Sequence, residues 1–393
     1  MIDLDTPSHI AQVMRHLTEN GYLAYLVGGC VRDAVMGRAV RDWDVATSAT
    51  PVEVARLFPK TFLTGEKFGT VTVLTRNDQV EITTFRTEGA YKDGRRPEHV
   101  EFVPSLEEDL SRRDFTINAM AVSPDGGLVD PHGGFKDIEN RIIRCVGGPN
   151  TRFREDSLRM FRAFRFSAQL GFEIEQDTLR AIYANADRAK LISTERVRVE
   201  LEKTLMSHRP EMAGEMVKIG LLCRYVTKTS KNPDNLEKIA KLPMEQMLRW
   251  CAFCAALLEE RFISSAMEFL REMRLDGRTI RTCSQALSIN ELPEDSVGIK
   301  ALFAKYGVDA VRCAAAARDT LSDGAALQRA GRVIASGECF SLNKLAVTGS
   351  DLIAIGHPPG RELGQALEKL LAHVIGRPED NTREALLEMA GAL

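Results

Sequence analysis

The sequence lacks the features that would place the chain in a membrane or outside the cell. It opens with MIDLDTPSHI, in which no basic segment precedes an apolar run, so we expect no export signal. The most apolar stretch, 252–258, ends at Glu259 and is far too short to span a bilayer. We therefore predict a cytoplasmic protein with no membrane association.

The chain also lacks a recognisable cysteine framework. Its eight cysteines are scattered, and the one close pair, Cys251 and Cys254, lies in a segment that reads as helix. A second pair or a nearby histidine cluster, which would complete a zinc site or a redox motif, is missing from the sequence. We therefore expect buried, reduced cysteines, as in a reducing compartment.

A strong positive charge is absent as well, since the formal net charge is −3. Net charge alone does not exclude a nucleic-acid partner, because binding depends on where the positive charge is concentrated. Here arginines gather in a few segments: Arg95, Arg96, Arg112, Arg113, Arg152, Arg154, Arg159, Arg162 and Arg165. A locally basic surface is therefore expected in the first half of the chain.

What the chain does contain is a change of pattern near residue 150. Strand-like runs at 22–27, 42–47, 70–75 and 79–85 alternate with short helical patterns, and later segments such as 191–205 show long helical periods. A chain of 393 residues exceeds one compact core. We predict a multidomain α+β protein with an α/β head at 1–140, then an all-helical neck at 141–210, body at 211–335 and tail at 336–393.

Two carboxylates lie two residues apart on the strand predicted at 42–47. Asp42 and Asp44 would then project from the same face, where they repel each other unless a cation lies between them. Ligands that offer only oxygen favour magnesium over zinc. Glu81, on the strand at 79–85, is either a third member of this site or a solvent-facing strand residue.

Upstream of these acids, Gly28 and Gly29 separate a predicted strand from a predicted helix. Glycines at such a junction let backbone N–H groups approach a phosphate, although a Gly-Gly pair is more often a plain turn. Arg32 follows on the first turn of the helix. It either reaches the same phosphate or lies on the surface, paired with Asp33.

Taken together, the motifs resemble the class II tRNA nucleotidyltransferases, a family of CCA-adding enzymes and poly(A) polymerases within the DNA polymerase β-like superfamily. The segment LVGGCVRDAVMGRAVRDWDVATSATP closely matches the family's first motif, and RRDFTINAM, REDSLRMFRAFRF and ISTERVRVELEK continue the match. The resemblance covers about the first 210 residues, is closest to the bacillus-type bacterial enzymes, and returns weakly at 345–360.

The resemblance implies a nucleotidyltransferase head with two Mg²⁺ ions on Asp42 and Asp44. Glu81 matches the third acidic position, so that catalysis would rest on Asp42, Asp44 and Glu81. It further implies CTP and ATP as substrates, and tRNA, gripped by its acceptor and T arms, as the partner. The positions that match nucleotide-binding residues are Gly28, Gly29, Arg32, Arg113, Asp156, Arg159, Arg162 and Arg165.

Within that set, Asp156 and Arg159 match the pair that reads the base. Cytosine and adenine both offer an amino donor beside a ring-nitrogen acceptor, which a carboxylate and a guanidinium complement. We place both residues on one face of a helix that spans about 154–166. Helical periodicity alone makes Arg165 a packed or salt-bridged structural arginine, whereas the family pattern makes it a nucleotide contact.

The resemblance implies addition of C, C and A to the tRNA 3′ end without a nucleic-acid template. The segment 87–99, which is rich in loop-forming residues, matches a family loop that is associated with adding the final A. The alternatives are an A-adding or CC-adding enzyme, a poly(A) polymerase, and a non-catalytic RNA-binding protein on the same fold.

Overall fold

The computed structural model describes residues 4–40, 42–65, 68–75, 78–88, 100–227, 231–322 and 324–393. Contacts divide the chain into two compact units, one formed by residues 1–204 and 218–224, the other by residues 205–217 and 225–393. The finer division at 140, 210 and 335 stays a prediction.

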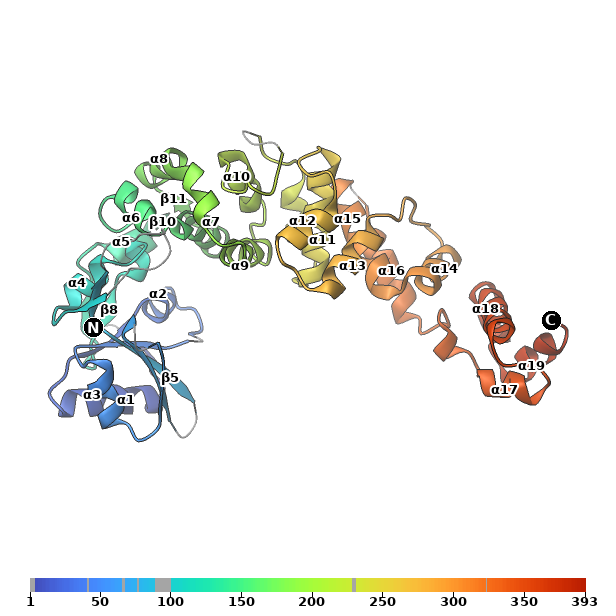
Figure 1. Ribbon diagram of the computed structural model, residues 1–393, viewed down its shortest axis with the longest axis horizontal. Coiled ribbons are helices and arrows are strands. Elements are labelled where there is room, and N and C mark those ends of the chain that lie inside the picture. Colours follow the sequence, from blue (N-terminus) through green and yellow to red (C-terminus); the bar gives the residue numbers. More distant parts are fainter. Residues whose placement is uncertain are drawn as a thin grey trace. The chain divides into compact units, whose positions relative to one another are not determined.

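The first unit is built on a mixed seven-stranded sheet (Figure 1). Its strand order is β3-β4-β5-β2-β1-β8-β9, and β2 and β5 are its one parallel pair. Two small two-stranded sheets, β6-β7 and β10-β11, accompany it. The strands are β1 Ala24–Val27, β2 Asp44–Thr47, β3 Thr61–Gly65, β4 Thr70–Leu74, β5 Gln79–Thr84, β6 Arg86–Glu88, β7 Val100–Phe102, β8 Ala121–Val122, β9 Leu128–Val129, β10 Ile142–Ile143 and β11 Glu173–Ile174.

One strand prediction is confirmed and another gives a strand that is too long. The hairpin expected from 70–75 and 79–85 is present as antiparallel β4 and β5. The strand expected at 42–47 is shorter, because β2 begins at Asp44 and Asp42 lies before it. Asp42 and Asp44 are therefore not held together by strand alternation.

Helices cover the sheet and extend the first unit beyond it. In Figure 1, α1 and α3 lie on one side of the sheet and α2 lies on the other. The helices are α1 Ser8–Glu19, α2 Gly29–Val35, α3 Pro51–Leu57, α4 Leu106–Ser111, α5 Gly134–Glu139, α6 Pro149–Glu155, α7 Leu158–Leu170, α8 Gln176–Asn185 and α9 Thr194–Leu205, with 3-10 turns η2 Thr116–Asn118 and η3 Ala186–Leu191. A core of Val27, Ala46, Phe85, Leu110, Ala121 and their neighbours packs sheet against helix.

The prediction of a single helix over about 154–166 is wrong. Helix α6 ends at Glu155, and α7 begins at Leu158. Between them Asp156 has extended backbone angles, φ −134° and ψ 104°, and its carboxylate accepts a hydrogen bond from the Leu158 N–H. An aspartate that bonds the backbone two residues ahead competes with the helix, so the chain turns here and starts a new one.

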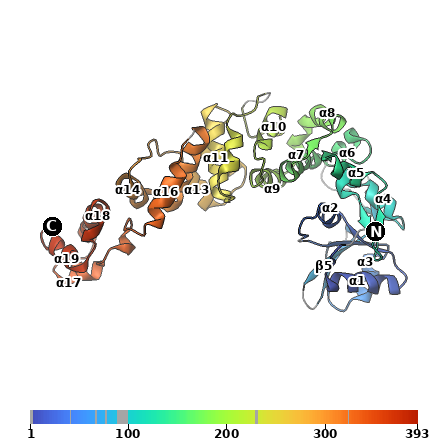
Figure 2. The same ribbon diagram turned by 180° about the vertical axis from the view of Figure 1, so that it is seen from behind.

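Helices are the only regular secondary structure among the described residues of the second unit (Figure 2). Helix α10, Met212–Ile219, spans the boundary between the two units. The others are α11 Gln246–Glu259, α12 Ala266–Glu272, α13 Gly277–Ala286, α14 Ser296–Tyr306, α15 Val308–Leu321, α16 Ala326–Ala335, α17 Gly349–Ala354, α18 Arg361–Gly376 and α19 Arg383–Gly391, with 3-10 turns η4 Leu236–Lys241, η5 Leu342–Lys344 and η6 Pro378–Asp380. The predicted fold class, an α/β head followed by helices, is confirmed.

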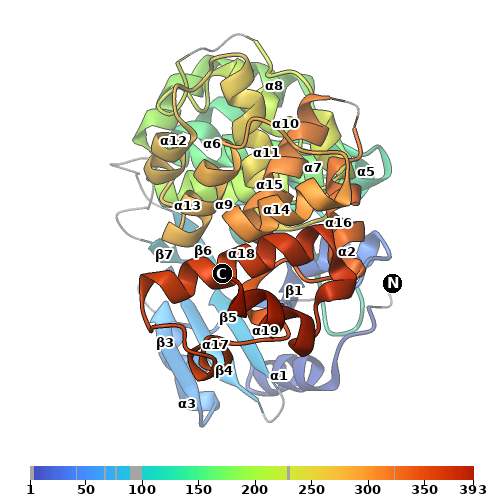
Figure 3. The ribbon, with the colours of Figure 1, turned by 90° about the vertical axis from the view of Figure 1, so that its right-hand side faces the viewer.

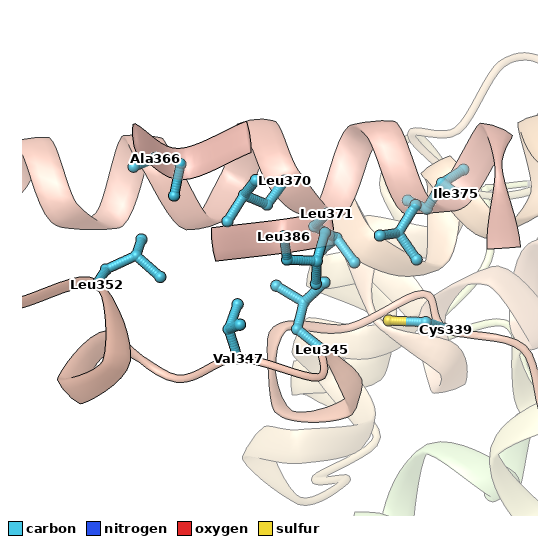
Figure 4. Packing of buried hydrophobic residues seen from close by; sticks show 11 residues of the cluster. Cys339, Leu345, Val347, Leu352, Ala366, Leu370, Leu371, Ile375 and Leu386 are labelled. Atoms are coloured by element: carbon cyan, nitrogen blue, oxygen red, sulfur yellow. The ribbon is translucent and has the colours of Figure 1, made fainter. Parts of the chain in front are cut away.

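The last three helices share an apolar core of their own. Helices α17, α18 and α19 pack on one another (Figure 3). Their buried side chains interdigitate, with Leu370 and Leu371 of α18 facing Leu386, Leu345 and Val347 (Figure 4). None of the described helices has the length and apolar character that crossing a membrane requires.

Candidate nucleotide-binding and catalytic site

The acidic residues gather where β2 and β5 run side by side. Asp44, the first residue of β2, is paired in register with Glu81 of β5. Burial raises the pKa of Asp44; Arg113 opposes this shift, while Glu81 and Asp42 add to it. The three carboxylates are thus close enough to repel one another, and a bound cation would relieve that repulsion.

The glycines at 28 and 29 form the turn between β1 and α2. Gly28 has φ 77°, which favours glycine, and a Cβ placed there would lie 3.0 Å from Nη1 of Arg113 and 3.9 Å from Oδ2 of Asp44. Gly29 begins α2. The bare backbone therefore lets Arg113 and Asp44 approach the start of the helix.

Arg32 is buried rather than on the surface. Its Nε and Nη2 donate to Oδ1 of Asp33, at 2.9 and 2.8 Å, and its Nη1 donates to Oδ1 of Asn118 at 2.7 Å. The pairing with Asp33 that the sequence allowed is thus present. The side chain is only 8% exposed, however, and it lines the cavity described next.

The glycines, Arg32, Arg113, Asp42 and Asp44 border one cavity of about 620 Å³ within the first unit, and Glu81 is not among its described lining residues. Eight basic and four acidic side chains are among its described lining residues, so a polyanion is favoured there. From the predicted site it brings together Gly28, Gly29, Arg32, Asp42, Asp44, Arg113, Asp156, Arg159, Arg162 and Arg165.

Asp156 and Arg159 both line this cavity, and each of them bonds to another group. Oδ2 of Asp156 accepts from Nη2 of Arg196 at 2.7 Å. Nη1 of Arg159 donates to Oε2 of Glu155 at 2.7 Å, and its Nη2 donates to the Arg112 carbonyl at 2.9 Å. The interruption between α6 and α7 explains this, because the two residues do not share one helical face.

Arg162 and Arg165 lie on α7 beside Phe166. Arg162 forms an ion pair with Asp114 and Arg165 forms one with Glu200, with N–O distances of 2.5 and 2.6 Å. The guanidinium of Arg165 lies 4.0 Å from the centroid of the Phe166 ring, close enough for a cation–π contact. Arg165 thus has the buried ion pair that periodicity indicated, and it also borders the cavity.

Several lining residues were not among the site residues predicted from the sequence: Arg112, Asp114, Asn118, Leu158, Phe166, Arg196 and Lys203. Arg196 and Lys203 are seven residues apart on α9, and this spacing puts them on the same helical face. That spacing was available in the sequence, but nothing in it links α9 to Asp156, because their contact is made in three dimensions.

The loop predicted at 87–99 lies largely outside the described residues, as do Arg95 and Arg96.

Three family models match successive parts of the chain. Residues 24–144 match the poly A polymerase head domain. Residues 171–224 match a probable RNA and SrmB-binding site of polymerase A, and residues 244–390 match a putative tRNA nucleotidyltransferase domain 2.

Similar proteins span nearly the whole chain. The CCA-adding enzyme of Limosilactobacillus fermentum is 37% identical, over 97% of this chain and 96% of its own. That of Geobacillus kaustophilus is 38% identical, over 95% and 94%. The crystal structure of the Bacillus stearothermophilus CCA-adding enzyme in complex with CTP is 33% identical, with a TM-score of 0.77 over 97% and 96%. The predicted resemblance and enzyme class are confirmed: the chain belongs to the family of CCA-adding enzymes, which are tRNA nucleotidyltransferases.

Proposed function

We propose that the protein adds C, C and A to the 3′ end of tRNA, using CTP and ATP and no nucleic-acid template. The observation that carries this proposal is the single cavity in which Asp42 and Asp44 face the same space as Asp156 and Arg159. One pair has the chemistry for nucleotidyl transfer and the other has the chemistry for choosing a base. Relatives that are alike over the full chain are CCA-adding enzymes, which supports the same reaction here.

Asp42 and Asp44 are the proposed magnesium ligands, with Glu81 beside them. The donor set fits, because carboxylate oxygens suit Mg²⁺, and because burial, together with the neighbouring Glu81 and Asp42, raises the pKa of Asp44 and so disfavours three bare charges. Two Mg²⁺ ions held there would activate the tRNA 3′-hydroxyl and stabilise the triphosphate and the departing pyrophosphate. Glu81 is exposed and is not among the described residues that line the cavity, but its register with Asp44 supports the catalytic role that we propose for it as the third carboxylate.

The triphosphate is proposed to lie against Gly28, Gly29, Arg32 and Arg113. Gly28 and Gly29 carry no side chains of their own, so a phosphate can approach the backbone at the start of α2 beside the guanidinium groups of Arg113 and Arg32. Arg113 donates from Nη2 to Oδ2 of Asp109 at 3.1 Å, while its buried Nε has no hydrogen-bond partner among the described residues. An unpaired buried donor in a positively charged cavity favours an anionic ligand.

Base choice is assigned to Asp156 and Arg159. The carboxylate would accept a hydrogen from the exocyclic amino group of cytosine or adenine, and the guanidinium would donate to the ring nitrogen. Uracil and guanine place a carbonyl where that amino group should be. The mismatch would leave buried polar groups unpaired, at a cost of about 1–3 kcal/mol.

The helical second unit is the proposed binding surface for the acceptor and T arms of tRNA. Binding by shape and phosphate contacts suits a protein that accepts every tRNA. A substrate made in the cytoplasm, together with cysteines that are all free thiols, supports a cytoplasmic location.

The test uses three tRNAs that end before CCA, after C, and after CC, each with Mg²⁺ and CTP, ATP or both. Addition that stops at CCA is expected with both nucleotides. Asp44→Asn should lower the rate about a thousandfold, because it removes a negative charge from the metal site. Binding of tRNA should be retained, and Glu19→Ala on α1 is the matched acidic control.

Other outcomes would change the assignment. Addition of A only to the CC-ended tRNA, or arrest after CC, would mean a divided system. Long A tracts would mean a poly(A) polymerase. No incorporation by the native protein would favour a non-catalytic RNA-binding protein, and full activity of Asp44→Asn would overturn the metal assignment.

A further inference from the structure

Three cysteines that are far apart in the sequence meet inside the second unit. Cys251 of α11, Cys283 of α13 and Cys313 of α15 have sulfur atoms that all lie within 4.8 Å of one another. Each side chain is at most 1% exposed. The sequence showed only the Cys251–Cys254 pair, because folding is what adds Cys283 and Cys313 to it.

The spacing of the sulfur atoms suits a shared metal ion. Sulfurs that bind one tetrahedral Zn²⁺ at about 2.3 Å lie about 3.8 Å apart, so each pair of sulfurs would need to close by at most about 1 Å to complete the site. Thiolates without oxygen ligands select soft ions such as Zn²⁺ and Cu⁺. The fully buried Cys254 lies one helical turn from Cys251 on α11, but its sulfur is outside the group that lies within 4.8 Å, so it would have to change its side-chain rotamer to become a fourth ligand.

We propose that Cys251, Cys283 and Cys313 bind one soft metal ion, Zn²⁺ or Cu⁺, that joins α11, α13 and α15. Binding forms metal–sulfur bonds and releases the thiol protons to solvent, with no change of oxidation state. The site lies in the second unit and takes no part in nucleotidyl transfer. Its role is to stabilise the helical unit, because an ion bound only by the folded state shifts the folding equilibrium.

The test measures metal on the full-length chain, purified without a metal-affinity step and kept reduced. Zn²⁺ and Cu⁺ are titrated separately against a competing chelator, and Co²⁺ serves as a spectroscopic probe. We expect one equivalent of Zn²⁺ or Cu⁺ per chain and a sulfur-to-cobalt charge-transfer band. Cys283→Ser should weaken binding at least tenfold, and Cys339→Ser, a buried cysteine of the C-terminal core, should not.

Further readouts keep the result independent of folding. Far-ultraviolet circular dichroism reports whether Cys283→Ser is folded, and the cobalt titration of the native chain stands without any variant. Loss of Zn²⁺ but not Cu⁺ in Cys254→Ser would support a four-ligand zinc site, whereas unchanged Zn²⁺ binding would support three ligands. The proposal would be overturned if the native chain took up none of the three ions. It would also be overturned if two of these cysteines formed a disulfide that persisted under the reducing conditions of the purification.

Discussion

Guanidinium groups are held differently in the cavity of the first unit and in the core of the second unit. In the first unit, the cavity arginines Arg113, Arg159, Arg162 and Arg165 each form an ion pair with a carboxylate. In the second unit, Arg249 is 1% exposed and donates to backbone carbonyls instead. Neutral partners leave a cation its full charge, whereas carboxylates cancel it.

The difference separates a binding site from a structural brace. A carboxylate fixes the direction of a guanidinium and makes its burial tolerable, and five N–H donors leave capacity for a ligand. Arg249 instead spends its donors on the carbonyls of Leu205, Ser207, Leu242 and Pro243. It thereby joins the segments 205–207 and 240–243, and it has the contacts of a residue that stabilises the unit.

The largest effect is expected from Arg249→Met. The substitution keeps much of the side-chain volume but leaves the buried carbonyls of Leu205, Ser207 and Leu242, and the part-buried carbonyl of Pro243, without this donor. We expect a loss of about 3–5 kcal/mol in the free energy of unfolding, measured by urea denaturation. The catalytic residues are untouched, so rates measured well below the unfolding midpoint should change little.

Arg278→Met is the control for this variant. Arg278 is 71% exposed and pairs with Asp309 at 2.6 Å, so its loss should change the free energy of unfolding by no more than about 0.5 kcal/mol. If Arg249→Met were as stable as the native protein, the cost of burying the charge would equal what its hydrogen bonds contribute, and the brace would be disproved.

A smaller effect is expected from Asp114→Asn in the first unit. Burial raises the pKa of Asp114, but Arg162, Asn118 and Arg159 together outweigh it and lower the pKa to about 2. A folded pKa below the unfolded value of 3.8 stabilises the protein at pH values above 3.8. This contribution, about 2 kcal/mol, is lost as the pH falls from 3.8 toward about 2.

Urea denaturation at pH 6 and at steps between pH 4 and pH 2 checks this prediction. Asp114→Asn keeps the Oδ1 acceptor for Asn118 but removes the charge opposite Arg162, so the variant should be less stable at pH 6 and lack the acid-dependent step. Asp177→Asn, which breaks an exposed pair with Arg180, should retain the native profile. If Asp114→Asn still lost stability between pH 4 and pH 2 as the native protein does, that loss would be assigned to other carboxylates.

Much of the site could be predicted because its residues lie in short, contiguous motifs. The strand, glycine turn and helix at 22–37 bring Gly28, Gly29 and Arg32 together through local structure alone. Local patterns of this kind persist in the fold because they depend on neighbours in the chain.

What sequence did not predict depends on contacts between distant segments. A continuous helical pattern hid the break at Asp156, because a side chain that bonds the backbone ahead has no effect on hydrophobic periodicity. Asp156 pairs with Arg196, which lies 40 residues further along the chain. Arg165 pairs with Glu200, which lies 35 residues further along. The cysteine cluster is the same case, since each sulfur comes from a different helix.

The smallest effect is expected from Arg196→Met, and it tests whether carboxylate pairing matters for base choice. Arg196 holds Oδ2 of Asp156, while the Leu158 N–H holds Oδ1. Without Arg196 the carboxylate can rotate, so we expect the preference for CTP over UTP to fall about tenfold, which corresponds to about 1.4 kcal/mol.

Arg198→Met on the same helix is the control, because Arg198 pairs with Glu202 and is not among the described lining residues. Single-turnover rates with each nucleotide measure the ratio. If Arg196→Met slowed CTP and UTP equally, Arg196 would serve the cavity's charge and not the orientation of Asp156.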